Sequence, residues 1–177
     1  MRSENLFSLY FFLEILHMDF AFYDVDEKYI QFLKKLDKQV PDVKYDSNNK
    51  FVCGIVLDIN GVPYYAPVSH MVKKQRTNLL ICDRQEPIAS IRFSFMFPAP
   101  RYVLTKKNFA QIATIDVKYA DLLKTEYMFC KKHIADIKRK ALDVYKIGCN
   151  KNHVLNYTCC DFLKLENNYL NFDNENK

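Results

Sequence analysis

"KFVCGIVLDINGVPYYAPVS", residues 50–69, is the stretch that decides the fold. Two apolar runs flank Asn60 and Gly61, and an Asn-Gly pair in this setting is a strong signal for a two-residue hairpin. Both central residues of a type I′ turn need positive φ, which asparagine and glycine tolerate best. The stretch therefore predicts two paired antiparallel strands. Further strands are expected in three aromatic or apolar runs, at 19–25, 78–83 and 89–97.

Helical periodicity appears on both sides of these strands. Asp26 can cap a helix whose apolar residues repeat at Tyr29, Ile30, Phe32, Leu33 and Leu36. From Tyr119 to Val144, apolar residues recur in steps of three and four, which predicts one helix of roughly seven turns. Gly148 is placed to stop that helix, and a short helix is expected around 160–170.

These elements predict a single α+β domain over residues 18–177. We expect a compact, strongly bent antiparallel sheet or barrel that carries the long C-terminal helix and shorter flanking helices. The chain has 177 residues, 49% of them hydrophobic, with 12 Tyr and 14 Phe, so it can bury a core and is not a disordered chain.

Composition also excludes several classes of enzyme. The chain has only three glycines, so no familiar phosphate-cradling glycine loop is present, which argues against nucleotide-cofactor enzymes. No HExxH motif or cluster of carboxylates indicates a metal site. Any catalysis is therefore expected to use side chains alone, without metal or cofactor. The net charge of +5 is compatible with an anionic partner.

The six cysteines read as thiols of a cytoplasmic protein, because their spacing contains no CxxC and one pair is adjacent. A zinc site is a second reading, since four possible ligands fall close together: Cys149, His153, Cys159 and Cys160. Their spacing is irregular, whereas zinc ligands are usually paired two to four residues apart.

Residues 1–17, "MRSENLFSLYFFLEILH", form a separate segment. The apolar run at 6–16 is too short to span a bilayer and contains Glu14, and no small-residue cleavage site precedes Met18. We expect the functional protein to begin at Met18, with residues 1–17 a non-essential extension and no membrane association. A protein anchored to a membrane by this segment remains an alternative.

Candidate chemistry gathers at the open end of the hairpin. Pairing across the Asn60-Gly61 turn is expected to bring Lys50 beside Ser69 and His70. A cation, a hydroxyl and an imidazole suit one metal-independent reaction, the attack of an RNA 2′-hydroxyl on its neighbouring phosphate. In that reaction the imidazole would exchange protons, and the other two groups would stabilise the negative charge. The alternative is a strand end with no catalytic role.

Cationic side chains that can hold a polyanion lie in two places. Lys73, Lys74 and Arg76 directly follow the candidate site, and Lys124 and Lys131 lie on the predicted long helix. All five are predicted to bind RNA. A solvated basic loop is the alternative for the first three.

The sequence also resembles the ToxN/AbiQ family, the endoribonuclease toxins of type III toxin–antitoxin systems. The resemblance rests on four stretches in order, which cover nearly the whole chain from Met18: "DEKYIQFLKKLDKQVPDV" (26–43), "KFVCGIVLDINGVPYYAPVSH" (50–70), "RFSFMFPAP" (92–100) and "YADLLKTEYMFCKKHIADIKRKA" (119–141). It implies a β-barrel core similar to that of the Kid/MazF toxins. It also implies cytoplasmic, metal-independent cleavage of cellular and phage RNA, leaving 2′,3′-cyclic phosphate and 5′-hydroxyl ends.

The resemblance further implies a partner. A small repeated antitoxin RNA, folded as a pseudoknot and processed by the toxin itself, would bind the toxin and block its active site. Toxin and RNA would then form a hetero-oligomeric assembly that acts in phage abortive infection. A non-catalytic RNA-binding module that uses the same basic surface is the alternative function.

The family's site residues carry over position by position. Its lysine before the first hairpin strand corresponds to Lys50, its hydroxyl residue after the proline to Ser69, and a tyrosine of its first helix to Tyr29, expected to contact RNA. Many members then have a serine followed by Pro-Lys, whereas this chain has His70, Met71 and Val72 before Lys73. His70 either takes over acid–base work from that serine or fills its space.

Overall fold

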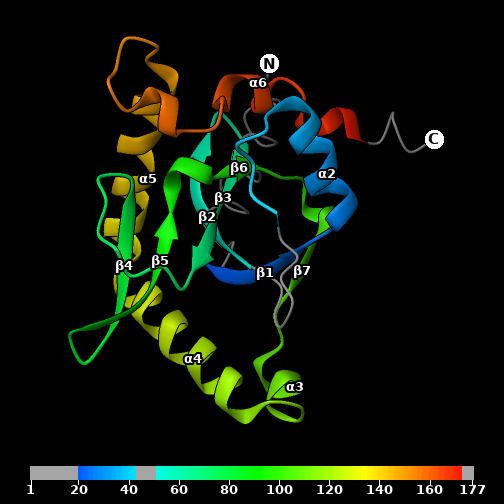
Figure 1. Cartoon of the computed structure of the whole chain (residues 1–177). Helices are drawn as coiled ribbons and strands as arrows, with labels where there is room; N and C mark the ends of the chain where they lie inside the picture. The colour runs from blue at the N-terminus through cyan, green and yellow to red at the C-terminus, as the bar shows by residue number, and fades with distance from the viewer. Residues whose placement is uncertain (1–19, 43–50, 173–177) are drawn as a thin grey trace, which may run out of the picture.

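The structure is a computed structural model, and it describes residues 20–42 and 51–172. Its described strands form a seven-stranded sheet in the order β4-β5-β3-β2-β1-β7, with β6 paired to β3 (Figure 1). All pairings in it are antiparallel. The strands are β1 (Ala21–Val25), β2 (Val52–Ile59), β3 (Val62–Ser69), β4 (Asn78–Asp83), β5 (Glu86–Arg92), β6 (Phe97–Pro98) and β7 (Leu104–Lys106).

Five α-helices accompany the sheet in the described residues: α2 (Glu27–Leu36), α3 (Phe109–Ala113), α4 (Val117–Lys132), α5 (Ile134–Cys149) and α6 (Phe162–Glu166). Short 3₁₀ turns lie at η1 (Phe93–Phe95), η2 (Arg101–Val103), η3 (Asn156–Thr158) and η4 (Tyr169–Asn171). Figure 1 shows α4 leading into α5 beside the β4–β5 hairpin, where α4 contacts β4 and α5 contacts β2. The chain is thus an α+β protein, as predicted.

The central hairpin is confirmed. Asn60 and Gly61 adopt φ values of 52° and 83°, and the Gly61 amide donates to the Asp58 carboxylate at 2.9 Å. β2 and β3 pair from Ile59–Val62 to Val52–Pro67, with one irregularity between Gly54 and Leu57. This register places the beginning of β2 beside the end of β3.

The cap of the first helix is also confirmed. The Asp26 carboxylate accepts hydrogen bonds from the amides of Lys28 and Tyr29, at 2.7 and 3.2 Å. Four residues of the predicted apolar stripe are buried: Tyr29, Ile30, Phe32 and Leu33.

The prediction of a single long C-terminal helix is wrong. The chain leaves helical geometry at His133 (φ −107°, ψ 23°), which ends α4 and precedes α5. The apolar stripe nevertheless continues across the break, through the buried side chains of Leu123, Cys130, Ile137 and Val144. Periodicity indicates which face of a helix is buried. Two consecutive helices that pack on the same core both bury that face, so the periodic pattern continues even where the backbone between them leaves helical geometry.

The helix ends one residue beyond the predicted stop at Gly148, and the glycine does not act as its cap. Gly148 lies within α5, which continues to Cys149. A Cβ atom added at Gly148 would lie 2.4 Å from Cε2 of Phe162 in α6. The missing side chain therefore permits close packing of two helices and does not terminate one.

Two expectations stay predictions. Residues 1–17 and the start at Met18 lie outside the described residues, and of the helices that are described, none is long and apolar enough to cross a bilayer. The described strands pair along one path whose ends are β4 and β7. The closed, Kid/MazF-like form of the sheet therefore remains an expectation.

Candidate active site and RNA interface

A hollow of about 350 Å³ lies where β3 ends, and we call it the Ser69 hollow. Residues from α2, the segment after α2, β3, β5 and η1 line it. Its charged, hydroxyl and aromatic lining residues are Lys34, Lys38, Asp42, Ser69, Arg92 and Phe95. Three cations therefore share this hollow with one carboxylate and one hydroxyl, an arrangement that favours an anionic ligand.

Ser69 is positioned by strand pairing. It is the last residue of β3 and is paired with Ser90 of β5. Its Oγ accepts a hydrogen bond from the Met71 amide at 3.3 Å. A serine hydroxyl has one proton as well as its lone pairs. The proton of Ser69 can therefore be donated to a ligand in the hollow while the backbone contact is kept.

The segment after Ser69, which we call the basic loop (residues 70–77), is held from beneath by two buried polar side chains. The Ser90 hydroxyl donates to the Met71 carbonyl oxygen at 2.6 Å. The Asn78 side chain donates to the Lys73 carbonyl oxygen at 2.9 Å and accepts from the Gln75 amide at 2.8 Å. These bonds hold the backbone of the loop in one conformation, and the side chains of residues 70–76 are exposed to solvent.

The predicted cations of the basic loop are exposed. His70, Lys73, Lys74 and Arg76 are all solvent-accessible, and the loop begins directly at Ser69. His70 and the three cations thus follow Ser69 along the chain, but none of the four is among the residues that line the Ser69 hollow. Their RNA-binding and catalytic roles stay predictions.

Lys50 lies outside the described residues. Its neighbour Phe51 is buried, and the Phe51 carbonyl oxygen accepts a hydrogen bond from the Val68 amide at 3.1 Å. The irregularity between Gly54 and Leu57 shifts the described register by two residues, so Val52 pairs with Pro67, whereas an unbroken hairpin would pair it with Ser69. The meeting itself remains a prediction.

Tyr29 is placed in the core. Its side chain is 0% exposed, and its hydroxyl donates to the Pro98 carbonyl oxygen at 2.7 Å. Burial raises the pKa of this phenol far above its ordinary value. Because Tyr29 belongs to the buried face of α2, this placement offers no surface for RNA and does not support the expected contact.

Arg92 is one of four charged residues of this hollow that were not predicted from the sequence, with Lys34, Lys38 and Asp42. It ends β5 opposite Asn78, and alternation along the strand puts it on the same face as Ser90. Its guanidinium lies over the Phe95 ring, 4.6 Å from the centroid. The available signal was its place at the head of "RFSFMFPAP" (92–100), but only the pairing of β5 with β3 connects it with Ser69.

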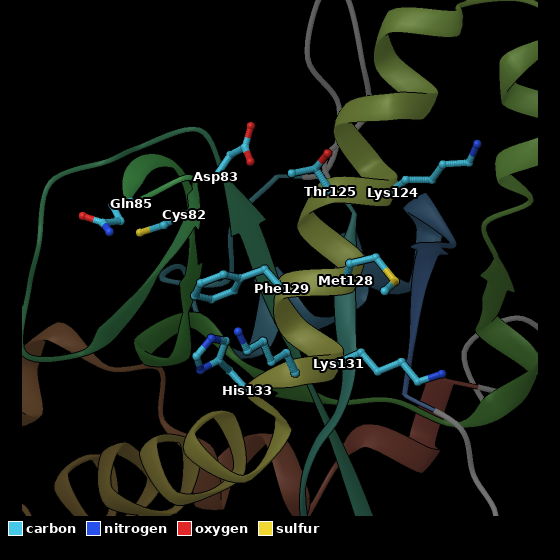
Figure 2. A pocket seen from close by; sticks show the side chains of 10 residues that line it. Cys82, Asp83, Gln85, Lys124, Thr125, Met128, Phe129, Lys131 and His133 are labelled. Carbon is cyan, nitrogen blue, oxygen red and sulfur yellow. The ribbon is translucent and has the colours of Figure 1, made fainter.

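A second, larger hollow of about 960 Å³ lies between α4 and the turn of the β4–β5 hairpin, and we call it the α4 groove (Figure 2). Lys124 and Lys131, both predicted to bind RNA, line it. Figure 2 shows these lysines on either side of Met128, whose side chain is 63% exposed. The Phe129 and His133 rings stack with centroids 4.4 Å apart. Exposed apolar and aromatic groups among cations are typical of surfaces that bind single-stranded RNA.

The structure gives no support to a zinc site at Cys149, His153, Cys159 and Cys160. Among residues 20–42 and 51–172, no group of three or more His, Cys, Asp or Glu side chains is arranged to hold a metal ion. His153 Nδ1 instead accepts a hydrogen bond from the Leu155 amide at 3.1 Å. The described cysteines are free thiols, and burial raises the pKa of Cys159 and Cys160.

The fold is that of the toxins of type III toxin–antitoxin systems. It superposes with a TM-score of 0.80 on a solved toxin from such a system that a non-coding RNA pseudoknot selectively inhibits, at 24% identity, covering 88% of this chain and 98% of that one. The solved AbiQ, a lactococcal anti-phage endoribonuclease of the same type, gives a TM-score of 0.76 at 22% identity, with 88% and 98% covered.

The family model described as "Toxin ToxN, type III toxin-antitoxin system" matches residues 21–170, and the chain belongs to this family. Endoribonuclease ToxN of Bacillus thuringiensis subsp. kurstaki is 26% identical over 155 residues, covering 82% of this chain and 80% of that protein. Endoribonuclease AbiQ of Lactococcus lactis subsp. lactis is 25% identical over 177 residues, with 90% and 92% covered. Endoribonuclease ToxN of Pectobacterium atrosepticum is 27% identical over 171 residues, with 87% and 94% covered.

Proposed function

We propose that this protein is an endoribonuclease toxin that cleaves RNA without metal, leaving 2′,3′-cyclic phosphate and 5′-hydroxyl ends. Membership of the ToxN family and the endoribonuclease activity named for its relatives support the reaction class. The observation that carries the proposal is the Ser69 hollow, where a hydroxyl lies among three cations at the start of the basic loop.

The reaction needs no group beyond RNA and side chains. The 2′-oxygen forms a bond to the adjacent phosphorus, the bond from phosphorus to the 5′-oxygen breaks, and the cyclic phosphate remains on the 3′-terminal nucleotide of the upstream fragment. A base takes the 2′-hydroxyl proton, and an acid protonates the departing 5′-oxygen. His70 serves as base or acid, while Ser69 and Lys50 stabilise the charge that develops on the phosphate oxygens.

The partner is an antitoxin RNA. One solved toxin with this fold is inhibited by a non-coding RNA pseudoknot, and we extend that partner to this protein. A repeat-derived pseudoknot, which the toxin processes, would cover the Ser69 hollow and the basic loop in a hetero-oligomeric complex. Released toxin would act in the cytoplasm on cellular and phage RNA.

Single-turnover cleavage of an RNA substrate in EDTA tests the reaction. We expect wild type to cut and to leave cyclic phosphate ends. Lys50→Ala and Ser69→Ala should each lose roughly a hundredfold or more in rate while still binding antitoxin RNA. Exposed residues supply the matched controls, Lys151→Ala and Thr105→Ala, which should cut as wild type does.

His70 is tested by the pH dependence of the same rate between about pH 5 and 9. As base or acid, it should make the rate titrate near neutral pH, and His70→Ala should abolish that titration. If it only fills space, His70→Asn will cut normally. A requirement for Mg²⁺ would contradict the mechanism, and tight RNA binding without any cleavage would establish the RNA-binding module instead.

A further inference from the structure

Arg92 differs from the other two cations of the Ser69 hollow in its surroundings. Lys34 Nζ lies 2.6 Å from the Asp42 carboxylate, so part of its charge is already neutralised. Lys38 is exposed to solvent. Arg92 is half-buried, and no ion pair joins it to a carboxylate in the described part of the chain.

The contacts that Arg92 does make are weak. Nη1 donates to the Met71 sulfur at 3.6 Å, and the guanidinium lies against the Phe95 ring. Nε is buried, and no hydrogen-bond acceptor among the described residues reaches it. Burial also lowers the pKa of this guanidinium, which means that its charge has lost solvation without compensation. A half-buried cation whose Nε donor is buried and unsatisfied is costly unless a ligand accepts a hydrogen bond from that donor.

The surroundings hold the guanidinium in place without occupying its donors. Strand pairing with Asn78 fixes the backbone of Arg92, and the Phe95 ring supports one face of the planar group. The donor edge is thus preorganised before any ligand arrives. A guanidinium offers parallel N–H groups that match two oxygens of a phosphate, which a lysine ammonium cannot do.

We propose that the Ser69 hollow is a phosphate subsite in which Arg92 binds the non-bridging oxygens of the scissile RNA phosphate. The inference rests on the proposed function for the identity of the ligand, since Ser69 shares the hollow. Negative charge on those oxygens increases in the transition state, so Arg92 stabilises the transition state more than bound RNA. Arg92 is therefore a catalytic residue, and Lys34 and Lys38 are secondary to it.

The first test is independent of cleavage. Titration of the wild-type protein with inorganic phosphate and with a nucleoside 3′-monophosphate is followed through arginine Nε–H signals in NMR spectra. The Arg92 signal, assigned by its loss in Arg92→Lys, should shift with saturation as the phosphate reaches Nε. An unshifted Arg92 signal while phosphate binds elsewhere, or no phosphate binding at all, would overturn the subsite.

The second test is single-turnover cleavage in EDTA at saturating RNA. Arg92→Lys should lose at least roughly tenfold in rate because it retains charge but not the paired donors, and Arg92→Gln should lose roughly a hundredfold. The affinity for RNA should fall by a smaller factor than the rate. The control is Arg139→Gln, on an arginine that is 74% exposed and pairs with Asp136 on α5, and it should cut normally.

These outcomes separate the two proposals. If wild type cuts RNA and Arg92→Lys cuts at the wild-type rate with an unchanged thermal melt, the role of Arg92 is refuted and the nuclease function stands. If wild type does not cut RNA, the nuclease function is refuted, and the NMR titration alone decides whether Arg92 binds phosphate. Arg92→Lys, which retains the charge and the stem, keeps the test decisive if Arg92→Gln fails to fold.

Discussion

At the scale of single residues, Glu126 is the most unusual side chain in the core. It lies on α4 with 0% exposure, and neither carboxylate oxygen has a hydrogen-bond partner within the described residues. Burial raises its pKa from 4.5 to about 7. Because the folded protein holds a proton that the unfolded chain releases, stability falls as pH rises from about 4.5 to about 7 and then levels off.

Glu126→Gln should remove that fall in stability, because the amide does not titrate. The difference between the pKa of the unfolded and the folded protein means that the buried carboxylate lowers the free energy of unfolding by at most about 3 kcal/mol above pH 7. Denaturant unfolding at several pH values between about 4 and 8 measures the difference between the two proteins. An equal fall in both would mean that another group carries the pH dependence. Asp121→Asn, on an exposed carboxylate of the same helix, is the control.

A functional site can be predicted from residue types alone only when its residues are neighbours in the sequence. Ser69 and His70 were predicted because they adjoin at the end of an obvious strand, and the structure places Ser69 in a hollow. Arg92 and Glu126 were missed, because an arginine or a glutamate in a sequence gives no sign of being buried without a partner. Tyr29 was predicted both in the apolar stripe of its helix and, by family position, as an RNA contact, and the structure buries it in agreement with the stripe.

At the scale of elements, the contact of α5 with α6 depends on Gly148. Gly148→Ala would place a methyl group within van der Waals overlap of the Phe162 ring. We expect a loss of about 1–3 kcal/mol in the free energy of unfolding, because α5 and α6 cannot separate to make room for the methyl group without opening the core. Urea unfolding measures the loss. Ala135→Gly, on the exposed face of α5, provides a comparison in which helix propensity changes without a clash.

Local signals predicted those elements that local chemistry determines. The Asn60-Gly61 turn and the Asp26 cap are each fixed by a few adjacent residues, and both were predicted from sequence. The break at His133 was not, because no proline or capping side chain marks it. It lies between a helix that contacts β4 and one that contacts β2 and η1, so tertiary packing determines it.

At the scale of the whole molecule, two basic surfaces are expected to share the RNA. Lys73→Ala with Lys74→Ala, and separately Lys124→Ala with Lys131→Ala, should weaken antitoxin RNA binding and flatten its salt dependence. For every lysine–phosphate pair that a substitution removes, the slope of log affinity against log salt falls by about 0.7 to 1. Binding titrations over a range of salt measure the slopes. The control is the double variant Lys138→Ala with Lys151→Ala, which changes two exposed lysines outside both surfaces. If a double variant of either surface has the same slope as this control, the two lysines that it removes do not contact phosphate.

Residues 1–17 lie outside the described residues, and the family model matches residues 21–170. We expect a protein that begins at Met18 to fold and to retain toxicity. Growth arrest on expression in a bacterial host and the thermal melt of the purified protein check this. Insolubility, or loss of toxicity with an intact fold, would show that residues 1–17 are needed.

The β4–β5 hairpin joins the two surfaces. Arg92 and Asn78, at one end, lie at the Ser69 hollow and the basic loop, while Asp83 and Gln85, at the other end, line the α4 groove. The five steps between the six residues of β4, at about 3.4 Å each, separate the ends by roughly 17 Å. We expect the hairpin to set the length of RNA that reaches both surfaces. An RNA long enough to reach along it should engage both, whereas a shorter one should engage only the Ser69 hollow and the basic loop, so cleavage efficiency should rise in a step once substrate length passes that span.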